Sequence, residues 1–265
     1  TLNLKNGKGF PPEPTNLITK RSKFIYDKDA KCPTWDMFLL QIFNKDTDLI
    51  RFVQKAMGYS LSGDVREQCL FILWGTGANG KSTFLNVLQE LFGDYACTTG
   101  TETFMKKTSE QSNDLARLKG IRLVTTTEVE QGKALSESLI KQITGGDEIT
   151  ARFLYGEYFS FKPTFKIFMA TNHKPKIRGA DNGIWRRIKM IPFTVTIPPE
   201  QRDKKLMEKL IAEQVQLYRR TNVVKSEKFS EIIQRTMNSY LNGMLTNEEV
   251  IQELLSLAKQ ISDAK

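Results

Sequence analysis

One eight-residue stretch, Gly-Thr-Gly-Ala-Asn-Gly-Lys-Ser at 75–82, constrains this chain more than any other part of its 265 residues. It fits the phosphate-binding pattern G-x-x-x-x-G-K-[ST], with an apolar run before it and a helical pattern after it. The glycines let backbone N–H groups approach a phosphate, and the start of the helix adds the positive end of its dipole. Lys81 supplies a cation for the β- and γ-phosphates, and Ser82 a hydroxyl for Mg²⁺.

The stretch therefore predicts a site for a nucleoside triphosphate. The alternative is a glycine-rich turn that fits by chance, but the flanking patterns are those that the motif requires. The predicted nucleotide-binding residues are Gly75, Thr76, Gly77, Ala78, Asn79, Gly80, Lys81, Ser82 and Thr83.

Predicted strands and helices alternate from residue 69 onward. Apolar and β-branched runs predict strands at 69–74, 121–127, 165–171 and 188–195. Periodic apolar positions predict helices at 81–92, 111–118 and 134–143. This order predicts an α/β fold of the P-loop NTPase (AAA+-like) type, in which helices flank both faces of a parallel sheet.

The rest of the chain divides into three predicted parts around an ATPase domain at 63–200. Residues 1–20 are polar and broken by glycines and prolines, which is typical of a flexible arm. Two small helices follow within 21–62, the first with Thr34 as its N-cap and the second stopped by Gly58. The tail at 201–265 is predicted to hold a helix at 227–242 and a final helix after a capping box at 246–249.

Composition narrows the class of partner. The net charge is +9, and the first 220 residues hold 34 basic and 24 acidic side chains. Such an excess suits a polyanion, most simply nucleic acid, although a solvated basic surface is the alternative.

Three scattered cysteines and one histidine argue against a zinc site, a disulfide framework and histidine-based catalysis. No apolar run approaches the roughly 18 residues of a membrane span, and no signal-peptide core opens the chain, so we expect a cytoplasmic protein.

Hydrolysis needs polar side chains at the strand ends beside the phosphate loop. Glu128 follows the strand at 121–127, and Glu130 lies two residues on, either facing the same way or in the following turn. We expect Glu128 to position Mg²⁺ or the attacking water, with Glu130 as a helper. Asn172 ends the next strong strand, where an amide can orient water. Arg186 and Arg187 are candidates for an arginine finger that acts across a subunit interface, with surface arginines as the alternative.

A hairpin is predicted between the acidic strand and Asn172. Strands at 149–154 and 157–161 flank its tip at 155–157. Cations and aromatic rings gather there, and such a hairpin can follow a phosphate backbone and stack bases. The predicted DNA-binding residues are Lys141, Arg152, Tyr155 and Lys162.

Five stretches of the chain, taken in order, resemble the superfamily 3 helicase domain of phage and plasmid primase–helicases, which has relatives in poxviruses. These stretches lie at 75–83, 122–132, 139–154, 165–173 and 183–193. The helical segment at 35–61 is similar to the one that precedes that domain. The resemblance implies an ATP- and Mg²⁺-dependent helicase of phage or mobile-element replication. It also implies a hexameric ring that moves 3′ to 5′ along single-stranded DNA, with the hairpin facing the pore.

The tail departs from that pattern. Residues 222–259 resemble the C-terminal helical region of the motor subunit of type I restriction enzymes. The helicase family's usual C-terminal part is not recognisable, and neither is a primase region. The alternative function is therefore a truncated or fused nucleotide- and DNA-binding module that does not unwind. An ATPase acting on RNA or on packaged duplex DNA also stays open, because phosphates look alike to Lys and Arg.

Overall fold

The computed structural model describes residues 1–4, 6–11, 13–24, 26–27, 29–106, 112–126, 134–173, 182–203, 205–207 and 209–210. The chain divides into two compact units, Thr1–Glu213 and Gln214–Lys265, and the described residues all lie in the first. The predicted tail helices lie outside the described residues. The predicted domain boundaries at 20, 62 and 200 stay predictions.

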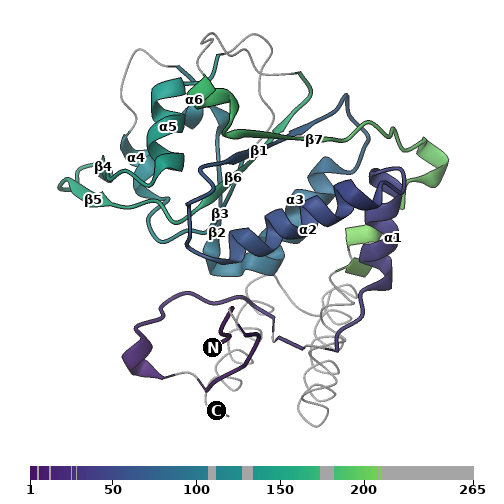
Figure 1. Cartoon of the computed structure of the whole chain (residues 1–265), viewed down its shortest axis with the longest axis horizontal. Coiled ribbons are helices and arrows are strands. Elements are labelled where there is room, and N and C mark those ends of the chain that lie inside the picture. Colours follow the sequence, from purple (N-terminus) through teal and green to yellow (C-terminus); the bar gives the residue numbers. More distant parts are fainter. Residues whose placement is uncertain are drawn as a thin grey trace, which may run out of the picture. The chain divides into compact units, whose positions relative to one another are not determined.

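A five-stranded parallel sheet forms the centre of the first unit (Figure 1). Its order is β2-β3-β6-β1-β7, so β6 lies between β1 and β3. The predicted parallel sheet and P-loop NTPase-like fold are thereby confirmed. The strands are β1 (Leu70–Trp74), β2 (Ala96–Thr99), β3 (Leu123–Thr126), β6 (Lys166–Thr171) and β7 (Ile188–Pro192).

Helices cover both faces of this sheet (Figure 1). Successive strand side chains point to opposite faces, so Phe71 and Leu73 share one core with the first three helices. Leu70 and Ile72 share a second core with the other three. The helices are α1 (Pro33–Ile42), α2 (Thr47–Leu61), α3 (Lys81–Phe92), α4 (Ser112–Ala116), α5 (Glu137–Gly145) and α6 (Asn182–Trp185). Short 3₁₀ turns lie at Pro14–Asn16, Gly93–Tyr95, Thr101–Phe104 and Pro199–Gln201.

The predicted hairpin forms, with shorter strands than expected. β4 (Ile149–Ala151) pairs antiparallel with β5 (Phe159–Phe161) as a separate two-stranded sheet. The residues between the two strands, 152–158, are all exposed, and Tyr155 has a φ of 60°. This left-handed backbone lies at the predicted tip, where the chain turns back.

Two predicted helix boundaries are wrong. Thr34 lies in the first turn of α1 rather than at its N-cap, because Pro33 takes the first helical position and Cys32 precedes it. α2 runs through Gly58 to Leu61. A glycine costs a helix only about 1 kcal/mol, and burial of Val53, Ala56 and Ser60 along α2 outweighs it.

One strand, β2, has no counterpart in the sequence prediction. Ala96 and Cys97 are half-buried and Thr98 is exposed, so its residues carry no apolar run. No helix within the described ranges is long and apolar enough to cross a bilayer.

Candidate functional site

The phosphate loop joins β1 to α3 through a backbone that includes several left-handed residues. Gly77, Ala78 and Gly80 have φ values of 109°, 50° and 83°. A mixture of left- and right-handed residues in a loop can turn N–H groups into one concavity that suits an anion. Ala78 holds a conformation that costs free energy for a residue with a Cβ, and strain of this kind gathers at binding sites.

Gly75 is required by the close approach of two elements. A Cβ at this position would lie 2.1 Å from the carbonyl oxygen of Phe193 and 2.4 Å from Nδ2 of Asn79. Asn79 is 3% exposed, and its Nδ2 donates to the Phe193 carbonyl at 3.0 Å. This hydrogen bond connects the phosphate loop to the segment that follows β7.

Lys81 is the central residue of the site. Its side chain is 3% exposed, although it carries a charge at the first position of α3. The ammonium donates to the Gly75 carbonyl at 2.5 Å, to Oδ1 of Asn79 at 3.2 Å and to Oδ1 of Asn172 at 3.1 Å. These three neutral oxygens fix where the charge lies.

The sheet order explains why Asn172 reaches Lys81. β6 pairs directly with β1, with Thr171 opposite Trp74, so both chains leave the sheet at the same edge. The Gly75 amide donates to the Thr171 carbonyl at 3.2 Å. The structure therefore brings together the phosphate loop and the predicted polar strand end. Glu128 and Glu130, predicted after β3, lie outside the described residues.

The two candidate finger residues have different surroundings. Arg187 is 8% exposed, and it donates to Oγ1 of Thr144 at 3.1 Å and to the Gly183 carbonyl at 2.5 Å. It braces α6 against α5. Arg186 is exposed and donates to Oε1 of Gln68 at 2.6 Å. Of the two, Arg186 has the side chain that is open to solvent.

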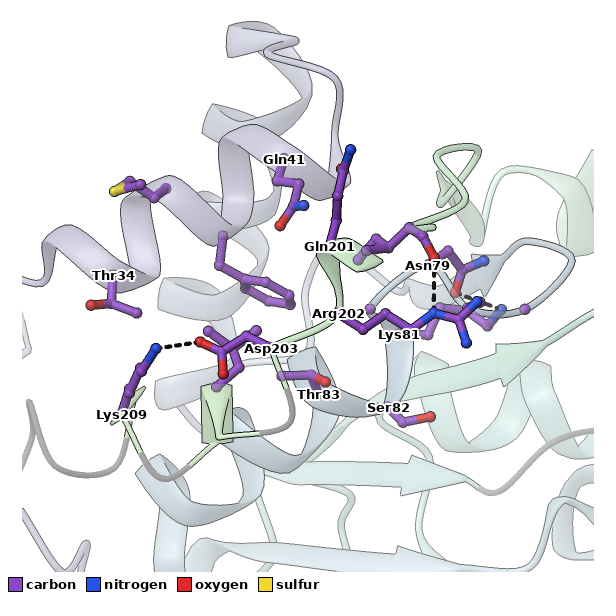
Figure 2. A pocket seen from close by; sticks show the side chains of 17 residues that line it. Thr34, Gln41, Asn79, Lys81, Ser82, Thr83, Gln201, Arg202, Asp203 and Lys209 are labelled. Carbon is purple, nitrogen blue, oxygen red and sulfur yellow. Dashed lines mark hydrogen bonds and ion pairs between the residues drawn. The ribbon is translucent and has the colours of Figure 1, made fainter. Parts of the chain in front are cut away.

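A pocket of about 720 Å³ opens beside the phosphate loop. Figure 2 shows Thr34 and Gln41 on α1 at one wall, and Gln201, Arg202 and Asp203 at another. Neither α1 nor the second wall, which lies in the segment after β7, was predicted to belong to the site. The lining residues are Thr34, Met37, Phe38, Gln41, Gly77, Ala78, Asn79, Gly80, Lys81, Ser82, Thr83, Ile197, Gln201, Arg202, Asp203, Leu206 and Lys209.

The pocket fits a nucleotide. The anion-binding loop lies at its base, the Gly75 cradle excludes a side chain, and its apolar wall includes Phe38. Ser82 lines the same pocket from the first turn of α3, where a hydroxyl suits Mg²⁺. The described residues contain no cluster of three acidic, histidine or cysteine side chains that would hold a metal by itself. Glu128, the second predicted Mg²⁺ ligand, is outside the described residues.

The hairpin exposes rings and cations. Tyr155 is fully exposed at its tip, and Phe153, Leu154 and Tyr158 are 49%, 68% and 63% exposed. The Arg152 guanidinium lies 4.7 Å from the Tyr158 ring centroid. Of the other predicted DNA-binding residues, Lys162 is exposed just after β5 and Lys141 is half-buried on α5.

Comparison with known families gives two matches that divide the chain. Residues 73–187 match a family described as "Family of unknown function (DUF5906)". Residues 196–265 match one described as "Type I restriction enzyme HindI endonuclease subunit-like, C-terminal". The predicted resemblance of the tail is confirmed, and the match begins earlier than the sequence analysis placed it.

Several viral proteins named as putative helicases are similar in sequence to this chain. "Putative helicase L207/L206" of Acanthamoeba polyphaga mimivirus is 34% identical over 188 residues, 70% of this chain and 20% of that protein. "Putative helicase V13" of Sputnik virophage is 25% identical over 264 residues, 96% of this chain and 33% of that protein. The chain thus spans a third or less of the length of these relatives.

Among solved structures, the C-terminal region of NrS-1 superposes with a TM-score of 0.53 at 13% identity, over 77% of this chain and 47% of that one. At this identity the likeness concerns the fold alone. The chain is therefore related in sequence to viral proteins named as helicases, it shares its fold with the NrS-1 C-terminal region, and its tail is related to type I restriction enzyme subunits.

Proposed function

We propose that this chain is the ATPase part of a superfamily 3 DNA helicase or translocase of viral, phage or mobile-element replication. The observation that carries the proposal is the position of Lys81. A buried ammonium is held by the phosphate loop and by Asn172 of the neighbouring strand end, at the base of a nucleotide-sized pocket. The relatives named as helicases support the same function.

ATP with Mg²⁺ is the proposed substrate. Lys81 would neutralise charge on the β- and γ-phosphates, and the loop amides would hold their oxygens. Ser82, together with Glu128, would hold Mg²⁺, which offsets the negative charge that develops during phosphoryl transfer. Asn172 would orient the attacking water, with Glu128 and Glu130 as the acidic residues at the next strand end.

A homo-oligomeric ring, by resemblance a hexamer, is the proposed assembly. In such a ring Arg186 would complete the ATP site of a neighbour, because its side chain is exposed whereas Arg187 is occupied inside the subunit. Single-stranded DNA would pass the hairpin, where Arg152, Tyr155 and Lys162 offer charge and a ring. Residence in the cytoplasm of a bacterial host stays a prediction from the sequence.

A second function has support of its own. The match of residues 196–265 to a restriction-enzyme family favours a fused module that binds nucleotide and DNA without unwinding. The two functions differ in assembly, since a finger that acts on a neighbour needs a neighbour.

Light scattering of the purified chain, with and without a slowly hydrolysed ATP analogue and single-stranded DNA, tests the ring. Lys81→Ala is the control, because it should lose the effect of the nucleotide while keeping the fold. A discrete ring that forms only when ligands are present supports the helicase. A monomer at every concentration supports the fused module.

A further inference from the structure

The wall of the pocket that follows β7 is connected to the phosphate loop by hydrogen bonds. Pro198 and Pro199 begin a 3₁₀ turn, and the amide of Arg202 closes it on the Pro199 carbonyl at 3.3 Å. The amide of Ile197 donates to the Ala78 carbonyl at 2.7 Å. Nε of Arg202 donates back to the Ile197 carbonyl at 2.9 Å. Two hydrogen bonds thus connect the Arg202 guanidinium to the phosphate loop.

The charges in this pocket are unbalanced. Its charged lining residues are Lys81, Arg202, Asp203 and Lys209. Asp203 already pairs with Lys209 at 2.5 Å, and a hydrogen bond from Lys209 lowers the pKa of that carboxyl. Within the described ranges, no carboxylate pairs with Arg202. The guanidinium of Arg202 therefore remains to meet an anion beside the phosphate loop.

We propose that Arg202 binds the β- and γ-phosphates of the nucleotide held by its own chain's loop. The assignment rests on the proposed function, and it differs from the role of Arg186, which would act on a neighbouring subunit. With Nε used to hold the side chain in place, the two terminal nitrogens of the guanidinium can donate in parallel to phosphate oxygens. Figure 2 shows the side chain extending from the turn toward the loop.

Calorimetric titrations with ATP, ADP and AMP, which measure the affinity for each nucleotide, test the proposal. Arg202→Gln should weaken ATP binding by about 10- to 100-fold, the value of a hydrogen bond to a charged group, and weaken AMP binding less. Arg202→Lys should keep part of the affinity, because it keeps the charge and loses the paired donors. Lys205→Gln is the matched control, since it removes an exposed cation of the same segment that does not line the pocket.

The losses of nucleotide affinity in the Arg202 variants should be independent of protein concentration, because the proposed contact lies within one chain. Unchanged ATP affinity in Arg202→Gln, alongside loss of binding in Lys81→Ala, would overturn the assignment and leave the proposed function standing. Equal losses for ATP and AMP would also overturn it, because the contact would then be to a group that both nucleotides carry: the α-phosphate, the ribose or the base. Absence of ATP binding by the unmodified chain would overturn the proposed function, and this assignment with it.

Discussion

The ammonium of Lys81 donates to the side-chain oxygen of Asn172 across 3.1 Å, although 91 positions separate the two residues in the chain. The contact exists because β6 pairs with β1 and both strands end at the same edge. It places the proposed sensor of the third phosphate beside the cation that we propose binds it.

Replacing Asn172 with alanine should therefore affect turnover more than binding. Lys81 keeps its bonds to Gly75 and Asn79, so ATP affinity should change by only a few-fold, about the value of one neutral hydrogen bond. If this amide orients the attacking water as proposed, its loss should lower kcat by about 10²-fold, as for other preorganised donors. Steady-state hydrolysis together with equilibrium binding separates the two effects. Equal losses in both would mean that Asn172 only supports the loop.

Arg186 and Arg187 should behave differently when each is replaced with alanine. Arg187→Ala leaves a buried gap between α5 and α6, and it should lower the free energy of unfolding by about 2 kcal/mol. Arg186→Ala should leave the urea midpoint unchanged and lower kcat by about 10³-fold, as for a missing arginine finger. Mixtures of Arg186→Ala with unmodified chain should fall below the activity of the unmodified fraction. Full activity of Arg186→Ala, alone and in mixtures, would end its assignment as the finger.

The hairpin tip should matter for DNA and not for folding. Tyr155 is fully exposed, so Tyr155→Ala should leave the melting temperature unchanged. It should weaken the binding of single-stranded DNA by about 5- to 100-fold if one base stacks on the ring. Fluorescence anisotropy of a labelled oligonucleotide measures this, and Lys205→Gln again serves as a distant surface control. The same affinity in Tyr155→Ala and the unmodified chain would remove the hairpin from the DNA path.

Lys166 should make stability depend on pH. It lies on β6 at 1% exposure, with its ammonium 2.6 Å from the Ser62 carbonyl and 4.3 Å from the Tyr59 ring centroid. Burial lowers its pKa from 10.5 to about 8. The folded chain therefore binds fewer protons than the unfolded chain between these two values, and the lysine's contribution to stability rises with pH across that window.

Lys166→Met isolates this effect. Burial raises the pKa values of Tyr59 and Cys69, which opposes the trend in the unmodified chain. The variant keeps both groups, so the difference between the two proteins reports on the lysine. Urea midpoints from pH 7.5 to 10 should show the unmodified chain gaining relative to Lys166→Met as pH rises. A constant difference would contradict a lowered pKa.

Much of this fold could be predicted because its signals are local. The apolar run before Gly75 and the periodicity after Lys81 predict β1 and α3 at nearly the observed bounds. Asn172 could be predicted as a site residue because polar residues at the carboxyl ends of parallel strands meet at one edge of the sheet. The sequence analysis missed β2, since a strand at the sheet edge needs little apolar surface.

The rest of the site depends on contacts between distant residues. Nothing local distinguishes Arg187 from Arg186, because the difference comes from Thr144 on another helix. The pocket wall at Arg202 exists because Ile197 bonds to Ala78, more than a hundred positions earlier. The burial of Lys166 likewise follows from the way α2 ends beside β6.

Hydrolysis of Mg²⁺·ATP by the purified chain, with and without single-stranded DNA, tests the central claim most directly. We predict that DNA raises kcat several-fold and that Lys81→Ala abolishes turnover in both conditions while its melting curve stays cooperative. Tight ATP binding with a turnover that DNA does not change would contradict the motor and favour the fused module.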